Sequence, residues 1–457
     1  MSKIYDLMIL GGGPAGYFAA ERAADAGLSV LLFEERALGG VCLNEGCIPT
    51  KAFLHSAKLV SSARHGEEFG LYAGDVRLDH SRVLERKNKV VDILVGGVTS
   101  TLKQKKVDVI AASAFVKGRN AEGFEVLANG ETYQGERLLI CTGSEVIVPK
   151  IEGLEQAFSS GFMMTSRECL ELLSVPETLV VIGGGVIGLE LANYFAIAGA
   201  GVTVVEMLPE VGGSIDADVA KNLRGNLERL GVTFMLEAKA AKILPEDSVI
   251  VSGADGQFSV PADKVLLSIG RRPRTAGAGL ENIGLYIDKG AVVTDASMRT
   301  NVPGVWAAGD VNGKSMLAHT AYREAAVSVA DMTGVKDPMR YDAIPQVIYT
   351  SPEAAGVGET ELSATAKGYS FDKAVLPMQY SGRYVAENAS GDGFVKALVC
   401  RKTGRVLGLH MVGTYASEII LGMTMIVGSK WSAQAARKIV YAHPSVGEIL
   451  RDVLLEF

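Results

Sequence analysis

Residues 7–16 read LMILGGGPAG, and residues 179–188 read LVVIGGGVIG. In each stretch an apolar run enters a set of glycines whose spacing suits a tight strand-to-helix turn, approach to a pyrophosphate and close helix packing. The following helix would present its N–H groups and positive dipole to phosphate. A second apolar run then ends in an acid, Glu34 or Glu206, 23 positions after the first glycine. Such an acid accepts hydrogen bonds from ribose hydroxyls, so the repeated pattern predicts two dinucleotide-binding α/β domains.

The acid of the second pattern also indicates which nucleotide binds there. A carboxylate at Glu206 suits a free 2′-hydroxyl and repels a 2′-phosphate. Met207 follows it, and no arginine stands there to clamp a phosphate. NAD is therefore favoured over NADP. Apolar and glycine-rich segments alternate through both halves of the chain, which predicts parallel sheets with flanking helices.

Length and charge limit the class of protein. The chain has 457 residues, and at roughly 150 residues per domain this predicts about three domains. A net charge of −7 argues against nucleic acid or an anionic membrane as the main partner. The sequence has no apolar run of the roughly 18 residues that a membrane span needs. Since no signal segment precedes the apolar stretch at 7–10, we expect a cytoplasmic protein.

Residues 39–51 read GGVCLNEGCIPTK and hold two of the five cysteines, Cys42 and Cys47. Five residues of regular helix rise about 7.5 Å, whereas a disulfide usually joins Cα atoms about 4.4–6.8 Å apart. A bonded pair therefore requires an irregular segment, which Gly46 and Pro49 favour. The alternatives are a static staple, unusual in the cytoplasm, two free thiols, or a metal site without a second Cys/His pair. The other cysteines are predicted to be small buried hydrophobes: Cys141, Cys169 and Cys400.

The motif at 39–51 resembles the redox disulfide of the pyridine nucleotide–disulfide oxidoreductases, and within that family most resembles the dihydrolipoamide dehydrogenase branch. The likeness extends over essentially the whole chain. It implies two Rossmann-like dinucleotide-binding domains and a C-terminal α+β dimerisation domain. The expected segments are an FAD-binding first part at 1–145, an NAD-binding domain at 146–274, a second FAD-binding or central part at 275–342, and a dimer-interface domain at 343–457.

The resemblance also implies two cofactors, FAD and NAD, and no metal. Asp310 would hold the ribityl–pyrophosphate region of FAD, and the Ala318 backbone would lie near the flavin ring. The residues expected at FAD are Gly11, Gly13, Pro14, Ala15, Gly16, Glu34, Glu35, Gly40, Val41, Cys42, Lys51, Ala114, Thr142, Gly143, Ser144, Asp310, Met316, Leu317, Ala318 and His319. Those expected at NAD are Gly183, Gly185, Val186, Ile187, Gly188, Glu206, Ala240 and Gly270.

The same resemblance assigns catalytic roles. A substrate thiolate would attack Cys42, and Cys47 would lie against the flavin. His443 and Glu448 match an acid–base pair that faces the disulfide of the other subunit of a homodimer, although a single histidine is more often an ordinary buried or surface residue. Lys51 and Glu190 match an ion pair beside the flavin; a solvated lysine and an ordinary helix glutamate are the alternatives. The chain departs from the usual pattern at 112–114, Arg274, Tyr441, Val446 and Gly447.

The expected activity is oxidation of the dihydrolipoyl group of a partner protein with reduction of NAD⁺. That partner would belong to a 2-oxo acid dehydrogenase complex or to the glycine cleavage system, and neither nucleic acid nor a membrane is expected. Two alternatives stay open. One is an NADH-dependent reductase of another small disulfide; the other is a non-catalytic, flavin-containing scaffold subunit. The chain ends LLEF, without the extra C-terminal cysteine pair of some relatives.

Overall fold

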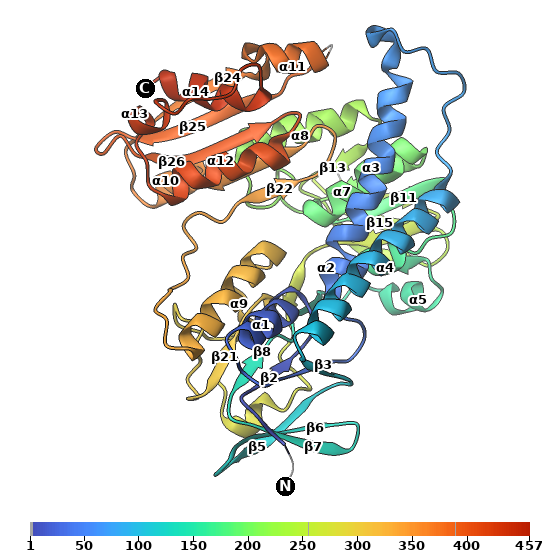
Figure 1. Ribbon diagram of the computed structural model, residues 1–457. Helices are drawn as coiled ribbons and strands as arrows, with labels where there is room; N and C mark the ends of the chain where they lie inside the picture. The colour runs from blue at the N-terminus through green and yellow to red at the C-terminus, as the bar shows by residue number, and fades with distance from the viewer. Residues whose placement is uncertain (1–2, 255, 389) are drawn as a thin grey trace. The chain divides into compact units, whose positions relative to one another are not determined.

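The computed structural model describes residues 3–254, 256–388 and 390–457. The chain forms two compact units, each built from three separate stretches of sequence (Figure 1). Unit 1 contains Met1–Thr50, Glu85–Val148 and Gly270–Arg340; unit 2 contains Lys51–Leu84, Pro149–Ile269 and Tyr341–Phe457. The helices α3 (Cys47–Arg64) and α4 (His80–Gln104) contribute to both. This division is coarser than the four expected segments and leaves their boundaries a prediction.

Unit 1 is built on a five-stranded parallel sheet of order β21-β8-β2-β3-β4. Its strands are β2 (Leu7–Leu10), β3 (Val30–Glu34), β4 (Asp108–Ala111), β8 (Leu138–Ile140) and β21 (Val305–Ala307). The connection from β2 to β3 is α1 (Pro14–Asp25), which packs against α9 (Ala318–Met332). Every residue of β2 is buried, as expected for a central parallel strand covered on both faces.

Smaller elements complete unit 1. They are β1 (Ile4–Tyr5), α2 (Gly40–Glu45), β5 (Phe115–Asn120), β6 (Gly123–Ala128), β7 (Glu131–Gly135), β9 (Ser144–Val146), β18 (Arg271–Pro273), η2 (Leu280–Ile283), β19 (Ile287–Asp288), β20 (Ala291–Val292) and η3 (Asp310–Asn312). Strands β9 and β18 pair antiparallel, although more than a hundred residues separate them in the sequence.

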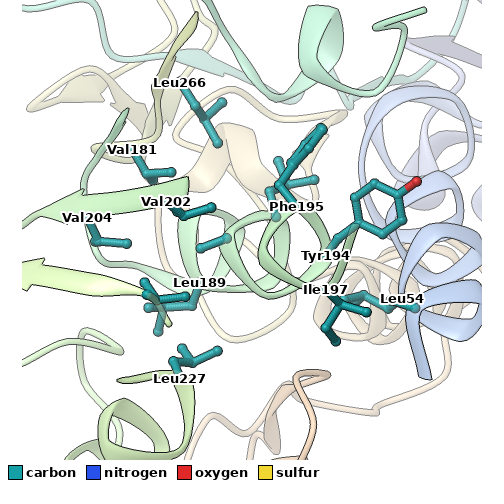
Figure 2. Packing of buried hydrophobic residues seen from close by; sticks show 14 of the residues in the cluster. Leu54, Val181, Leu189, Tyr194, Phe195, Ile197, Val202, Val204, Leu227 and Leu266 are labelled. Carbon is teal, nitrogen blue, oxygen red and sulfur yellow. The ribbon is translucent and has the colours of Figure 1, made fainter. Parts of the chain in front are cut away.

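Unit 2 repeats the parallel design and adds a second sheet. The parallel sheet has the order β10-β17-β11-β12-β13. Its strands are β10 (Met163–Met164), β11 (Thr178–Ile182), β12 (Gly201–Val205), β13 (Thr233–Met235) and β17 (Lys264–Leu267). From α7 (Val186–Ala198), Leu189 and Phe195 enter a core that includes Val181 and Val202, which lie on neighbouring strands (Figure 2). Both predicted parallel sheets are thus confirmed.

The C-terminal part of unit 2 is an antiparallel sheet of order β22-β23-β26-β25-β24. Its strands are β22 (Gln346–Ile348), β23 (Ala354–Gly358), β24 (Phe371–Pro377), β25 (Phe394–Cys400) and β26 (Val406–Val412). The remaining elements are η1 (Gly66–Phe69), α5 (Leu154–Ser159), α6 (Ser166–Cys169), α8 (Ala217–Arg229), β14 (Lys239–Leu244), β15 (Ser248–Gly253), β16 (Gly256–Pro261), α10 (Glu361–Ala366), η4 (Met378–Tyr380), α11 (Gly382–Glu387), α12 (Ala416–Gly428), α13 (Ala433–Ala436), η5 (Val446–Glu448) and α14 (Ile449–Leu455).

This sheet buries charged and titratable side chains. On β25 the Lys396 ammonium is buried and lies 2.9 Å from Asp216 and 2.7 Å from Asp218, and it also pairs with Glu361. His410, its register partner on β26, donates Nε2–H to the Glu359 carbonyl at 2.9 Å. Burial lowers the pKa of His410 below its usual value, and the Lys396 charge acts in the same direction, whereas the Asp216 and Glu361 carboxylates oppose it.

A stability prediction follows from this histidine. In the unfolded chain this histidine takes up a proton near pH 6.5, whereas folded His410 does so only at lower pH, so His410 makes the folded state less stable as pH falls below about 6.5. For one group the slope approaches about 1.4 kcal/mol per pH unit. We expect His410→Gln to flatten the fall in unfolding free energy between about pH 6.5 and 5, measured by urea titration. The same replacement at exposed His55 is the control, and equal slopes in wild type and His410→Gln would contradict the prediction.

Candidate functional site

Both glycine patterns adopt the same turn. Gly11 and Gly183 have φ of +104° and +107°. A Cβ on either would lie within 2.5 Å of a carbonyl oxygen on the neighbouring strand segment. A Cβ on Gly16 would lie 1.8 Å from the Gly11 carbonyl oxygen, and one on Gly188 would lie 2.2 Å from that of Gly183. Backbone atoms therefore leave no room for a side chain at these positions. The glycine spacing predicted such a tight turn and such close helix packing.

The middle glycine of each pattern leaves open space in front of a helix. Gly13 and Gly185 are the N-caps of α1 and α7, and neither helix has a side-chain cap. A Cβ on Gly185 would meet nothing within 4 Å, and one on Gly13 would meet only the Gly40 Cα, at 3.8 Å. Uncapped N–H groups facing such a space suit a pyrophosphate. The residues present therefore fit two dinucleotides.

The two acids are held in matching positions. One oxygen of Glu34 accepts from the Gly12 N–H at 2.7 Å, and the other accepts from the Arg36 N–H at 2.8 Å. Glu206 repeats this with the N–H groups of Gly184 at 2.6 Å and Leu208 at 2.8 Å. Because a carboxylate can accept about four hydrogen bonds, both acids keep acceptor capacity for ribose hydroxyls.

In unit 1 a polar chain joins the predicted FAD residues Ser144 and Asp310. The Ser144 hydroxyl donates to the Asp310 carboxyl at 2.5 Å, and Arg271 donates from Nε to the same hydroxyl and from Nη2 to the Ser144 carbonyl, both at 2.7 Å. Burial raises the pKa of Asp310, and the Ser144 hydrogen bond and the Arg271 charge act against that rise. Sequence reasoning missed Arg271, whose only signal was its place directly after Gly270.

Arg274 is a second arginine in this region. Its guanidinium pairs with Glu35, which was predicted at FAD, and this contact lowers the pKa of the Glu35 carboxyl. The Arg274 carbonyl accepts from the Thr142 hydroxyl at 2.6 Å, and its N–H donates to the Gly143 carbonyl at 2.9 Å. Arg274, at which the chain departs from the family pattern, thus contacts three residues that were expected to bind a cofactor.

The cysteine segment leaves regular helix where the spacing requires it to. Helix α2 ends at Glu45, Gly46 has φ −143° and ψ −104°, and α3 begins at Cys47. Cys42 and Cys47 are half-buried, whereas the other three cysteines are buried. The start of α2 packs on the first glycine turn, because a Cβ on Gly40 would lie 2.7 Å from the Gly13 Cα. The cysteine segment therefore begins directly beside the first dinucleotide motif.

Two tyrosines lie near this segment and were not predicted. Tyr17 on α1 and Tyr322 on α9 are hydrogen-bonded through their hydroxyls, with ring centroids 5.9 Å apart. Burial raises the pKa of both phenols, and negative charge on Cys42 would raise them further. Both tyrosines are therefore neutral hydrogen-bonding groups close to Cys42. Because 305 residues separate them in the sequence, no local pattern predicted that they would meet.

In unit 2 the Lys51 ammonium on α3 lies 2.7 Å from Glu190 Oε2 on α7. Glu190 is buried, and its other oxygen accepts from the Tyr349 N–H at 3.0 Å. The Tyr349 ring was not anticipated, and the Lys51 ammonium lies 4.3 Å from its centroid. Cys47 and Lys51 occupy positions i and i+4 of α3, so they project from the same face of that helix.

The His443 imidazole is exposed and is held from one side. Its Nδ1 lies 3.0 and 3.2 Å from the two oxygens of Glu448, and its side chain is 76% exposed. Burial would raise the pKa of Glu448, but hydrogen bonds from His443 and Ser445 and the nearby Arg451 bring it below its usual value. An ionised carboxylate only accepts hydrogen bonds, so Nδ1 carries a proton, and Nε2 would be the basic nitrogen of the neutral ring. Tyr441, one of the positions at which the chain departs from the family pattern, takes no part in this pair; its hydroxyl donates to the Ala436 carbonyl.

The remaining predicted residues lie on or beside several different elements. Met316, Leu317, Ala318 and His319 lead into α9, which begins at Ala318 without a side-chain cap. Val186 and Ile187 form the exposed start of α7, and Pro14 and Ala15 the start of α1. Ala114 precedes β5, Ala240 lies on β14, and Val41 lies on α2. Gly270 has φ +119° and belongs to unit 1, whereas the other residues predicted at NAD belong to unit 2.

The family model described as pyridine nucleotide-disulphide oxidoreductase matches residues 5–325, and that of the family's dimerisation domain matches residues 344–454. The chain belongs to this family. It is therefore an oxidoreductase of the pyridine nucleotide–disulphide class with a C-terminal dimerisation domain, as the motifs predicted. No helix in the described ranges is long and apolar enough to cross a membrane.

Curated members of the family resemble the chain over its whole length. A protein named dihydrolipoyl dehydrogenase from Chlamydia muridarum is 34% identical, covering 100% of this chain and 97% of the relative. One of the same name from Thermus scotoductus is 37% identical, covering 98% and 96%. Among solved structures, LpdA from Mycobacterium tuberculosis has a TM-score of 0.89 at 27% identity, covering 98% of this chain and 99% of that one. The HOCl-induced flavoprotein disulfide reductase RclA from Escherichia coli has a TM-score of 0.86 at 29% identity, covering 98% and 99%.

Proposed function

We propose that this chain is a dihydrolipoyl dehydrogenase, which oxidises the dihydrolipoyl group of a partner protein and reduces NAD⁺ to NADH with FAD as its second cofactor. The observation that carries this proposal is the full-length likeness to curated relatives of that name. The chain's own residues agree with it, because they supply two half-buried cysteines and an exposed imidazole oriented by a carboxylate.

The proposed chemistry starts at sulfur. His443 Nε2 takes a proton from one substrate thiol, and the resulting thiolate attacks Cys42 of a Cys42–Cys47 disulfide, so Cys47 leaves as a thiolate. The second substrate thiol loses its proton to solvent and attacks the substrate sulfur of the mixed disulfide, and Cys42 leaves with the proton that His443 holds. The substrate becomes a cyclic disulfide, and the cysteine pair gains two electrons. FAD, when bound, supplies the transfer of that electron pair to NAD⁺.

The supporting residues hold charge and geometry. Glu448 fixes the tautomer of His443 and stabilises the imidazolium that forms during proton transfer. Lys51, fixed by Glu190, places a positive charge beside the flavin, where negative charge increases during reduction. We place the cofactors at the residues expected from the sequence, FAD at the first glycine motif and NAD at the second.

A homodimer fits the exposed position of His443, which would serve the cysteine pair of the other subunit. Apolar side chains of the C-terminal part of unit 2 are also exposed: Val440, three residues before His443, is 95% exposed, and exposed Leu421 and Met425 project from one face of α12. Such residues suit burial against a second copy. The lipoyl-carrying partner belongs to a 2-oxo acid dehydrogenase complex or to the glycine cleavage system, and we place the protein in the cytoplasm.

A second candidate is reduction of another small disulfide by NADH. The observation in its favour is the similarity to RclA, whose name describes a disulfide reductase. Steady-state assays of the purified flavoprotein separate the two activities. We expect NAD⁺ reduction by dihydrolipoamide to have a higher kcat/KM than NADH oxidation by glutathione disulfide or coenzyme A disulfide. A faster reaction with either disulfide would favour the second candidate, and no turnover with any substrate would favour a scaffold.

The nucleotide preference gives a separate prediction. We expect Glu206→Gln to lower the preference for NAD over NADP by about 10- to 100-fold, because it weakens a charged hydrogen bond to ribose and removes repulsion of a 2′-phosphate. The measurement is kcat/KM with each nucleotide. The matched control is Glu237→Gln, which removes an exposed carboxylate shortly before β14. An unchanged ratio in Glu206→Gln would show that Glu206 does not contact the ribose.

A further inference from the structure

The Lys51 ammonium lies between a carboxylate and an aromatic face. Glu190 Oε2 is 2.7 Å away, and the centroid of the Tyr349 ring is 4.3 Å away. An ammonium over a tyrosine ring is attracted by the negative face of the π system. Unlike the carboxylate, the ring attracts the ammonium without cancelling its charge. Lys51 is thus held in place while its positive field is preserved on that side.

One carboxylate fixes both partners of this contact. Glu190 accepts from Lys51 with Oε2 and from the Tyr349 N–H with Oε1, at 3.0 Å. One turn further along α7, Asn193 Oδ1 accepts from the Ser351 N–H at 3.3 Å. Glu190 and Asn193 are both buried, so the backbone at residues 349–351 is tied to α7 by two hydrogen bonds that little water reaches. The ring therefore has a defined place over Lys51.

We propose that Tyr349 is a positioning residue that holds the Lys51 charge in place and thereby raises the reduction potential of the bound flavin. The inference rests on the proposed place of Lys51 beside FAD. The Lys51 side chain is 32% exposed, and a lysine stem that lost its ring contact would sample several rotamers. A mobile charge stabilises a fixed neighbouring negative charge less well than a preorganised one.

The contact between Tyr349 and Lys51 joins two different parts of the sequence. Tyr349 lies in the stretch matched by the dimerisation model, whereas Lys51 and Glu190 lie in the stretch matched by the redox model. All three belong to unit 2. The C-terminal domain therefore contributes a side chain that tunes redox behaviour, in addition to supplying the surface for the dimer.

The test compares holoenzyme variants by the two-electron midpoint potential of bound FAD, measured by equilibration with reference dyes. We expect Tyr349→Leu to weaken flavin reduction about threefold to tenfold, which is about 14 to 30 mV for a two-electron couple. Tyr349→Phe keeps the ring and should stay close to wild type. Tyr380→Leu, which removes an exposed tyrosine of the same unit, is the matched control and should leave the potential unchanged.

Two further comparisons separate positioning from packing. Fluorinated phenylalanines at position 349 keep the ring shape but weaken its negative face, so the potential should fall as fluorine is added. In the Lys51→Met background, Tyr349→Leu should cause no additional shift. A wild-type potential in Tyr349→Leu, or equal shifts in the Phe and Leu variants, would overturn the inference. So would an unchanged potential in Lys51→Met. Absence of dihydrolipoamide oxidation with the shifts retained would instead refute the proposed substrate and support the positioning role.

Discussion

Cys42→Ser is expected to yield a yellow, folded protein whose NAD⁺ reduction by dihydrolipoamide is near zero. A serine hydroxyl cannot form the bond to Cys47, so the substrate thiolate has no disulfide to attack. FAD should remain bound, because the glycine turn, Glu34 and the Ser144–Asp310 pair do not depend on the Cys42 sulfur. The measurement is steady-state turnover together with the flavin absorbance of the purified protein.

Two controls make this result specific. Cys400→Ser makes the same chemical change at a buried cysteine at the end of β25, and it should keep wild-type turnover. NADH oxidation with an artificial electron acceptor bypasses the dithiol and should survive in Cys42→Ser. Undiminished dihydrolipoamide oxidation in Cys42→Ser would refute the assigned role of the cysteine pair.

The parts of the fold predicted from sequence are those determined by local chemistry. Gly11 and Gly16 are spaced so that the turn closes on its own carbonyl, and the same holds at Gly183 and Gly188. The contact between the third and the first glycine of each turn is therefore local, although the first glycine also lies against a distant segment, at Cys141 or Ser268. The break at Gly46 between the cysteines was predictable for the same reason, since a regular helix does not suit a disulfide at that spacing.

The missed residues make contacts between segments that are far apart in the sequence. Arg271 reaches Ser144 across the β9–β18 pair, and the Tyr349 ring covers Lys51 from almost three hundred residues away. Neither contact has a periodicity or a spacing that one sequence reveals. The division into two units also depends on contacts between distant segments, because residues 51–84 belong to unit 2 whereas the first glycine motif and the cysteines, which precede them, belong to unit 1.

His443→Gln is expected to lower turnover with dihydrolipoamide by roughly 10²- to 10⁴-fold, the usual contribution of a positioned general base. An unperturbed cysteine thiol titrates at about pH 8.5, so substrate thiols without a base supply little thiolate at pH 7. The residual activity of His443→Gln should therefore rise with pH as the substrate ionises itself, whereas wild type should gain much less. Reduction of an artificial acceptor by NADH should be unaffected.

Replacement of Glu448, which accepts from His443, should also lower turnover with dihydrolipoamide, but by less than His443→Gln does. In Glu448→Gln the amide oxygen can still accept from Nδ1–H, so orientation is kept while the negative charge that stabilises imidazolium is lost. Because the pKa of Glu448 is lowered, this carboxylate stays ionised throughout the working range, and its own titration should not shape the wild-type profile above about pH 4.5. Glu456→Gln, at an exposed C-terminal carboxylate, is the matched control. If His443→Gln kept wild-type turnover at pH 7, the proton would have to leave the substrate by another route, and the role of the His443–Glu448 pair would be disproved.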